Sequence, residues 1–190
     1  PHPFGVHDML SMDRLGAPQP SPDGQWAVFT VRSWDSESNK ATTNLWLVSI
    51  DGARLRQLTS VRARTDSNPI WAPDSRSIAF VSNRSGSSQI WTIALNGGEA
   101  TQLTALPLDV DNLRWSPDGS QIAFSADVYP DSDLTATAQR DKARADNPVK
   151  AMKFDRLFIR HWDEWADGKR SHIFVVAVTD RSVEPSRDSG

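Results

Sequence analysis

Cysteine is absent from this sequence of 190 residues, and tyrosine occurs only once. A chain without cysteine has no disulfide framework, no thiolate metal site and no thiol nucleophile. Long apolar runs are also missing, because none approaches the roughly 18–20 residues that a membrane-spanning helix needs. Neither sign of charge is in large excess: the formal net charge is -3, whereas a general nucleic-acid-binding protein carries a basic face. We therefore expect neither membrane nor nucleic acid as a partner.

Large apolar side chains are scarce as well. Leu, Ile, Val and Phe make up about 22% of the chain, just above the roughly 20% below which a chain tends to be disordered. Eight tryptophans offset this shortage, so we expect a folded chain whose core relies on indole rings. They are Trp26, Trp34, Trp46, Trp71, Trp91, Trp115, Trp162 and Trp165.

An internal repeat organises the sequence. Three landmarks recur in one order: a Pro-Asp turn, an apolar stretch that contains Trp, and a Gln-Leu-Thr tripeptide. The turns begin at Ser21, Ala72 and Ser116, the apolar stretches span 45–48 and 90–93, and the tripeptides span 57–59 and 102–104. The spacings lie between 44 and 51 residues, and self-similarity at a nearly fixed period is the signature of a repeat fold.

The chemistry of the landmarks predicts the repeating unit. Pro fixes φ, Asp bonds to nearby backbone and Gly accepts positive φ, so the Pro-Asp sequences predict tight hairpins. A third strand, an Asn-Gly-Gly turn at 96–98 and a fourth strand follow. Four antiparallel strands in about 45 residues describe a blade of a β-propeller. The runs 28–29, 78–80 and 122–124 are predicted to be inner strands buried on both faces.

The predicted fold class is therefore all-β: a partial β-propeller of about three four-stranded blades. A short N-terminal helix over 6–15 and a helical insert in the third blade complete it. We place the lead-in at 1–16, the blades at 17–65, 66–108 and 109–190, and the insert at 128–170.

The insert makes the third repeat about 38 residues longer than the second. Its part at 133–146 is polar, rich in Ala and free of Gly. Ser132 or Asp133 can cap this part and Pro148 can end it, so we predict a solvent-exposed helix. The part at 153–165 combines aromatic and charged residues. A loop this long inside a compact repeat is usually functional or disordered, and the aromatic content favours a function.

These repeats resemble the propeller of the prolyl oligopeptidase family of serine peptidases, in the branch of the acylaminoacyl peptidases and dipeptidyl peptidase V. The resemblance covers 4–178. It rests on SPDG-x-x-[IV]-A-F followed by [LI]-W-x-[VI], on HDMLSMDRLGAPQPSPDGQWAVF at 7–29, and on FDRLFIRHWDEWADGKRSHIFVV at 154–176. It implies a larger exopeptidase that removes dipeptides or acylated residues from peptide N-termini, with a propeller of seven or eight blades. A separate α/β-hydrolase domain would carry the Ser-Asp-His triad.

The chain departs from that family in one respect, because it contains no Gly-x-Ser-x-Gly. The nearest string, at 86–89, lacks the second Gly and lies in a predicted hairpin loop, whereas a nucleophile elbow needs a strand-to-helix turn. We expect no catalytic residue and no cofactor in this segment, which would gate and line the substrate chamber. Its partners would be the rest of the same protein and a peptide substrate; a homo-oligomer is compatible with this. We expect a periplasmic or secreted location, with the cytoplasm as the alternative.

The candidate substrate-binding residues gather in the insert: Arg160, Trp162, Asp163 and Glu164, with Tyr129 at its start. The resemblance implies that Asp163 or Glu164 meets the free α-ammonium of a peptide, since a charge-assisted contact is strong and directional. Arg160 would meet a carbonyl or carboxylate, and Tyr129 would line the chamber. In the structural alternative, the tryptophans pack the insert onto the blade and the charged residues form surface ion pairs.

Other candidate sites are weaker. His2 and His7 lack a carboxylate at ligand spacing, so no metal site is expected, and the basic residues at 140–144 alternate with Asp and predict a solvated helix face. Two other functions stay open. One is a non-catalytic propeller that binds a protein partner, as TolB does. The other is a propeller glycosidase, although no pair of carboxylates stands out.

Overall fold

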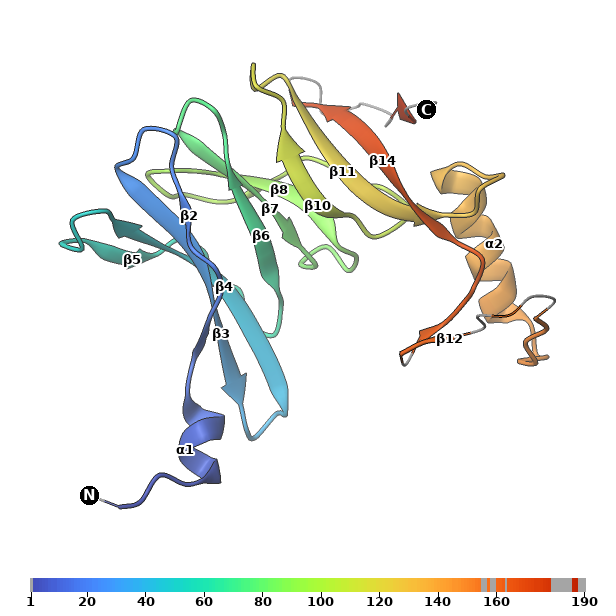
Figure 1. Ribbon diagram of the computed structural model, residues 1–190, viewed down its shortest axis with the longest axis horizontal. Helices are drawn as coiled ribbons and strands as arrows, with labels where there is room; N and C mark the ends of the chain where they lie inside the picture. Colours follow the sequence, from blue (N-terminus) through green and yellow to red (C-terminus); the bar gives the residue numbers. More distant parts are fainter. Residues whose placement is uncertain (1, 155–156, 158–159, 163, 179–185, 188–190) are drawn as a thin grey trace.

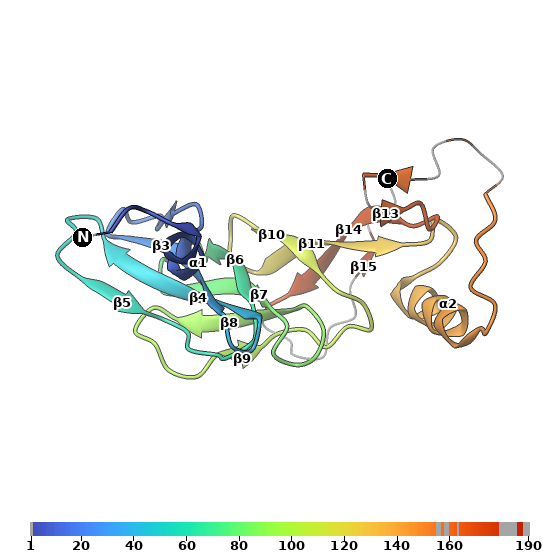
Figure 2. The same ribbon diagram turned by 90° about the horizontal axis from the view of Figure 1, so that it is seen from below.

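The computed structural model describes residues 2–154, 157, 160–162, 164–178 and 186–187. Three antiparallel sheets stand side by side in chain order, with one helix near the first sheet and another beyond the third (Figure 1). A view from below shows the second helix set apart from the sheets (Figure 2). Within the described residues, no helix is both long and apolar enough to cross a membrane.

The first sheet is built around a long hairpin. Its strands are β1 (Arg14–Leu15), β2 (Gln19–Pro20), β3 (Trp26–Asp35), β4 (Lys40–Ser49) and β5 (Leu55–Gln57). β3 pairs with β4, β4 pairs with β5, and β1 and β2 both pair with β3. The β3–β4 register runs without interruption from Trp26–Ser49 to Asp35–Lys40, so this hairpin extends well beyond the three residues that β5 pairs with.

The second and third sheets repeat a four-stranded meander. The second consists of β6 (Asp66–Trp71), β7 (Ser77–Ser82), β8 (Gln89–Ala94) and β9 (Thr101–Gln102). The third consists of β10 (Asp111–Trp115), β11 (Gln121–Val128), β14 (Arg170–Ala177) and β15 (Ser186–Arg187). Between β11 and β14 the insert contributes α2 (Leu134–Asp146) and a small hairpin of β12 (Arg160–His161) and β13 (Glu164–Trp165). The predicted fold class, a partial β-propeller with a short helix and a helical insert, is confirmed.

The ends of one helix agree with the prediction from the sequence, and the end of the other does not. The Asp133 carboxylate caps α2 by accepting a hydrogen bond from the Ala136 amide at 2.7 Å, as expected. By contrast, α1 (Val6–Ser11) ends before the predicted residue 15. The chain after it is drawn into the first sheet, because β1 pairs with β3 and the Gly16 amide donates to the Thr30 carbonyl at 2.8 Å.

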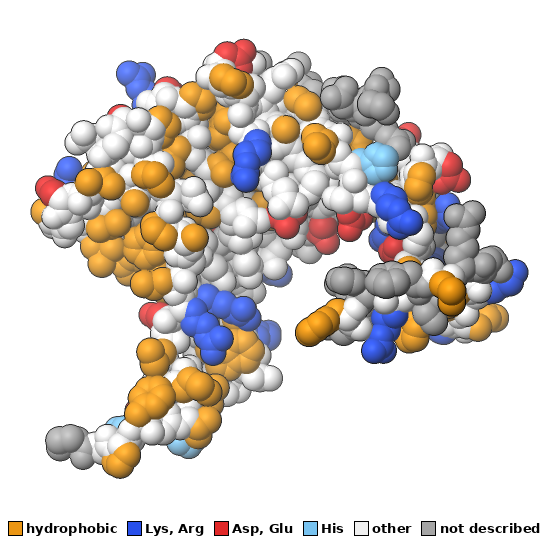
Figure 3. Space-filling view, in the orientation of Figure 1, with side chains coloured by type: hydrophobic (Ala, Val, Ile, Leu, Met, Phe, Trp, Pro, Cys, Tyr) orange, Lys and Arg blue, Asp and Glu red, His pale blue; other side chains and the backbone are white. Residues whose placement is uncertain are grey.

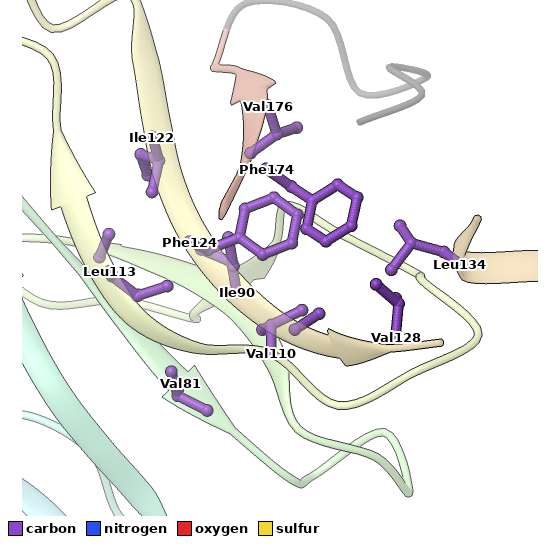
Figure 4. Close-up of a cluster of buried hydrophobic side chains, with 12 residues drawn as sticks. Val81, Ile90, Val110, Leu113, Ile122, Phe124, Val128, Leu134, Phe174 and Val176 are labelled. Atoms are coloured by element: carbon purple, nitrogen blue, oxygen red, sulfur yellow. The ribbon is translucent and has the colours of Figure 1, made fainter. Parts of the chain in front are cut away.

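The apolar core lies between the sheets and consists of two clusters. The first joins Val28, Leu45 and Leu47 of the first sheet to Ile78, Phe80 and Ile93 of the second. The second joins the opposite face of the second sheet to the third, where Phe124 and Phe174 stack with ring centroids 5.8 Å apart (Figure 4).

Because the second sheet lies between the two others, its inner strand β7 is buried on both faces. Ile78, Ala79 and Phe80 are all 0% exposed, as predicted for 78–80. In the outer sheets, Phe29 and Ala123 are only half-buried. The prediction of two-sided burial fails for these two residues, because each outer sheet has a neighbouring sheet on one side only in the described part of the chain.

Candidate functional site

A groove of about 600 Å³ opens between the second and third sheets. Its lining is rich in carboxylates, among them Asp109, Asp111 and Asp127, with Lys169 beside them. Acidic side chains lie in the hollow of the molecule between its two projections, the α1 region and the insert (Figure 3). Clustered carboxylates in a concave surface create a negative potential that suits a cationic group. Among the described residues, no three His, Asp or Glu side chains are placed to hold a metal ion.

Two asparagines of the groove occupy a special backbone position. Asn68 in β6 and Asn112 in β10 have φ values of 49° and 55°, and the pairing register of each strand is irregular there. Asn tolerates this left-handed region better than most residues. The Asn68 amide donates to the Asp111 carboxylate, and the Asn112 amide donates to the Ser125 hydroxyl at 2.9 Å. These bulges turn polar side chains into the groove.

This pair of asparagines was not predicted from the sequence, although the sequence contains a signal for it. The string Asn-x-x-Trp-[Ala/Ser]-Pro-Asp occurs at 68–74 and again at 112–118, 44 residues later. The residues before each turn therefore carry a second repeated polar position, in addition to the aspartate of the turn itself.

The base of the insert is held by a polar network. Tyr129 is 3% exposed. Its hydroxyl donates to Asp141 of α2 at 3.0 Å, and the Lys169 ammonium meets the other oxygen of Asp141 at 3.1 Å. Lys169 also pairs with Asp167 at 3.2 Å, and the guanidinium of Arg140 lies 3.8 Å from the centre of the Tyr129 ring. The structure thus places Tyr129 at the anchor of the insert.

The charges of this network are stabilised by one another. Burial on its own would lower the pKa of the Lys169 ammonium, but hydrogen bonds to Asp141 and Asp167 outweigh it and raise that pKa above its usual value. Burial would likewise raise the pKa of the Asp167 carboxyl, but the amide and ammonium of Lys169 hold it below its usual value. The Lys169 ammonium and the Asp167 carboxylate therefore stay charged around neutral pH.

The other predicted site residues lie on the β12–β13 hairpin. Trp162 is at its tip, is 87% exposed and has φ 53°, so it does not pack against a blade. Arg160 lies over the Trp165 ring, 5.5 Å from its centre, and Trp165 stacks on Phe154. Asp163 and the side chain of Glu164 lie outside the described residues, so their predicted contact with an ammonium group stays a prediction.

Three neighbouring antiparallel sheets, one of five strands and two of four, define the chain as a segment of a β-propeller. A family model described as the TolB beta propeller domain matches residues 11–144. The chain belongs to this family.

Individual relatives extend the match to the insert. Dipeptidyl-peptidase 5 of Porphyromonas endodontalis is 29% identical over 181 residues, and that of Porphyromonas gingivalis is 31% identical over 191 residues. These matches cover 95% and 94% of this chain but 25% of each relative. In the solved acylaminoacyl peptidase of Pyrococcus horikoshii, 26% of the chain matches 95% of this one, with a TM-score of 0.68 at 14% identity.

The chain therefore spans about a quarter of the length of the relatives it matches. The predicted resemblance to the dipeptidyl peptidase V and acylaminoacyl peptidase branch is confirmed by these relatives. Since only about a twentieth of the chain lies outside the matches, they include most of the insert as well as the blades.

Proposed function

We propose that this chain is the propeller segment of a serine exopeptidase that removes dipeptides or acylated residues from the N-termini of peptides. The supporting observation is the similarity to two dipeptidyl-peptidases along nearly the whole chain, insert included. A nucleophile elbow is absent from the sequence, so the acyl-transfer chemistry would belong to the remaining three quarters of such a protein. There a serine, a histidine base and an oxyanion hole would perform it.

The role of this propeller segment would be to admit the peptide substrate and to hold it. The acidic groove offers carboxylates to a free α-ammonium, and Asp163 or Glu164 of the hairpin would supply further ones. Arg160 and Trp162 would contact the peptide from the exposed hairpin, while Tyr129 would act indirectly by fixing the insert. A ring of blades would exclude folded proteins, because only a narrow opening leads through it.

Peptidase assays of the full-length gene product test this function. We expect it to release p-nitroaniline from dipeptidyl or N-acetyl-aminoacyl p-nitroanilides. Trp162→Ala should raise KM about 5-fold or more and leave kcat nearly unchanged, because a contact made equally in the ground and transition states affects KM alone. Ile50→Ala, a change at another exposed apolar residue, should alter neither. A full-length protein that cleaves neither class of substrate would favour the alternative of a non-catalytic, TolB-like propeller.

A further inference from the structure

Another pocket, about 950 Å³ in volume, lies between the first and second sheets. Three arginines border it, Arg54, Arg56 and Arg76, and we call it the basic pocket. Among the described residues that line it there is no Asp or Glu, and apolar side chains such as Trp26 and Leu55 form much of its wall. Its charge is therefore opposite to that of the acidic groove between the second and third sheets.

The ends of strands from two neighbouring sheets form the basic pocket. Arg54 closes the turn between β4 and β5, Arg56 lies in β5, and Arg76 directly precedes β7. The Arg56 guanidinium donates a hydrogen bond to the carbonyl of Leu95, the residue that follows β8. Figure 2 shows the loop after β8 close to β5. This hydrogen bond therefore ties the first sheet to the second and gives the pocket a fixed wall.

The guanidinium groups of the basic pocket keep hydrogen-bond donors for a ligand. Arg54 lies over the Trp26 ring, 4.6 Å from its centre, and stacking of this kind leaves the N–H groups at the edge of the guanidinium plane available. Among the described residues, none of the three arginines forms an ion pair with a carboxylate. The pKa of the Asp51 carboxyl is lowered chiefly by the Ser49 hydroxyl and to a smaller extent by Arg54. The positive charge of the pocket is therefore largely uncompensated.

The internal repeat shows that the fold does not require these four side chains. Residues 45–48 and 57–59 recur 45 residues later, and the first Pro-Asp turn recurs 51 residues later. At the equivalent positions another repeat has a different kind of residue: Glu99 for Arg54, Thr101 for Arg56, Gln25 for Arg76 and Ser77 for Trp26. The same strands and turns form with either set. Since the turns do not need three arginines and an indole, a ligand accounts for their convergence on one pocket.

We propose that the basic pocket binds a small organic anion, in which a carboxylate or phosphate group is attached to an apolar body. The planar fork of an arginine pairs with two oxygens of either group at once, and the apolar wall would cover the rest of the ligand. The volume of about 950 Å³ lies within the range of roughly 300–1,000 Å³ that is usual for small-molecule sites. This inference is independent of the proposed function, because the basic pocket and the acidic groove lie at different sheet interfaces.

Calorimetric titration of the full-length gene product tests this with three probes: 4-phenylbutanoate, 2-phenylethyl phosphate and the neutral 4-phenylbutanamide. We expect at least one of the two anions to bind, and the amide to bind at least about 10-fold more weakly. Arg76→Gln should weaken binding of the anion about 10-fold, the usual effect of losing a hydrogen bond to a charged group. Arg62→Gln, at an exposed arginine outside the pocket, should leave it unchanged. Binding of neither anion, equal binding of the amide, or equal losses in the two variants would overturn the proposal.

Hydrogen exchange on the same protein locates the bound anion. Amides at 50–56 and 94–98 should exchange more slowly when the anion is present, because a ligand stabilises the backbone that it contacts. Amides at 109–127, which border the acidic groove, should not change. Arg76→Gln should reduce the protection while its exchange without ligand stays that of the wild type; if this variant does not fold, Arg54→Gln replaces it. Protection found only outside 50–56 and 94–98 would place the anion elsewhere and refute the assignment of the pocket.

Discussion

Three aspartates in turns accept short hydrogen bonds from serine hydroxyls, and two of them, Asp23 and Asp118, belong to the repeated Pro-Asp turns. Ser21, Ser49 and Ser116 each donate a hydroxyl hydrogen bond of 2.5 Å to the aspartate two residues later. In the third of these turns, the Ser116 hydroxyl and then the Ser120 amide lower the pKa of Asp118 to about 2. A turn that binds its own carboxylate in this way favours the charged form, and Pro117 between them sets φ for it.

This predicts how the turn responds to acid. The pKa of Asp118 is lower in the folded than in the unfolded chain, so its contribution to stability is present above about pH 4. It disappears as the pH falls through the folded value of about 2. Ser116→Ala removes the largest cause and should move the titration of Asp118, followed by carboxyl ¹³C NMR, up toward the usual value. Ser125→Ala, in the body of β11, serves as control. An unmoved titration after Ser116→Ala would show that the hydroxyl is not the cause.

A second residue-scale prediction concerns Gln89 in β8, which is 1% exposed. Its amide nitrogen donates to the carbonyls of Leu106 and Leu108 at 3.1 and 3.0 Å, and its oxygen accepts from Thr104 and Leu106. Gln89→Ala leaves several buried polar groups without partners and should cost about 3 kcal/mol of unfolding free energy. Denaturant unfolding followed by Trp fluorescence measures this. The exposed Gln121→Ala should change little, and a similar small effect at Gln89 would contradict the argument.

At the scale of elements, the sequence predicted those features that local chemistry decides. The Pro-Asp turns located three hairpins, and Asp133 and Pro148 bounded α2, because caps and turns involve residues that are adjacent in the chain. The end of α1 at Ser11 and the burial of Tyr129 were not predictable in this way. The first depends on pairing with β3, and the second depends on Asp141 of α2 and on Lys169 near β14, partners that only the folded insert brings together.

The polar contacts that hold α2 lead to a prediction about the stability of the insert. α2 buries only Leu134 and Thr137, so its position depends on the polar contacts of Asp141. Asp141→Ala removes the bonds to Tyr129 and Lys169; since the ion pair is partly exposed, we expect a loss of about 1 kcal/mol. Amides of α2 should then exchange about 5-fold faster by hydrogen exchange. Lys142→Ala, on the exposed face of the helix, should have no such effect, and equal exchange in the two variants would show that the network does not hold α2.

At the scale of the whole molecule, the apolar content reflects how the fold is stabilised. Most of the core lies between sheets, so each sheet depends on its neighbours, as in other repeat proteins. In the described part of the chain, the first and third sheets each keep one face without a neighbouring sheet. The side chain of Ile173 in β14 is 64% exposed on such a face, and an uncovered sheet face or edge favours association with other chains.

The dependence on neighbours predicts how residues 1–190 behave when they are produced alone. We expect a broad thermal transition by circular dichroism and binding of a hydrophobic dye, because two sheet faces stay uncovered. We also expect no hydrolysis of dipeptidyl p-nitroanilides, since the chain holds no nucleophile elbow. The full-length protein should melt in a sharper transition and bind less dye. A sharp melt of the isolated segment would mean that three sheets suffice as a cooperative unit. Peptidase activity in the isolated segment would place the nucleophile within these residues and contradict its location elsewhere in the polypeptide.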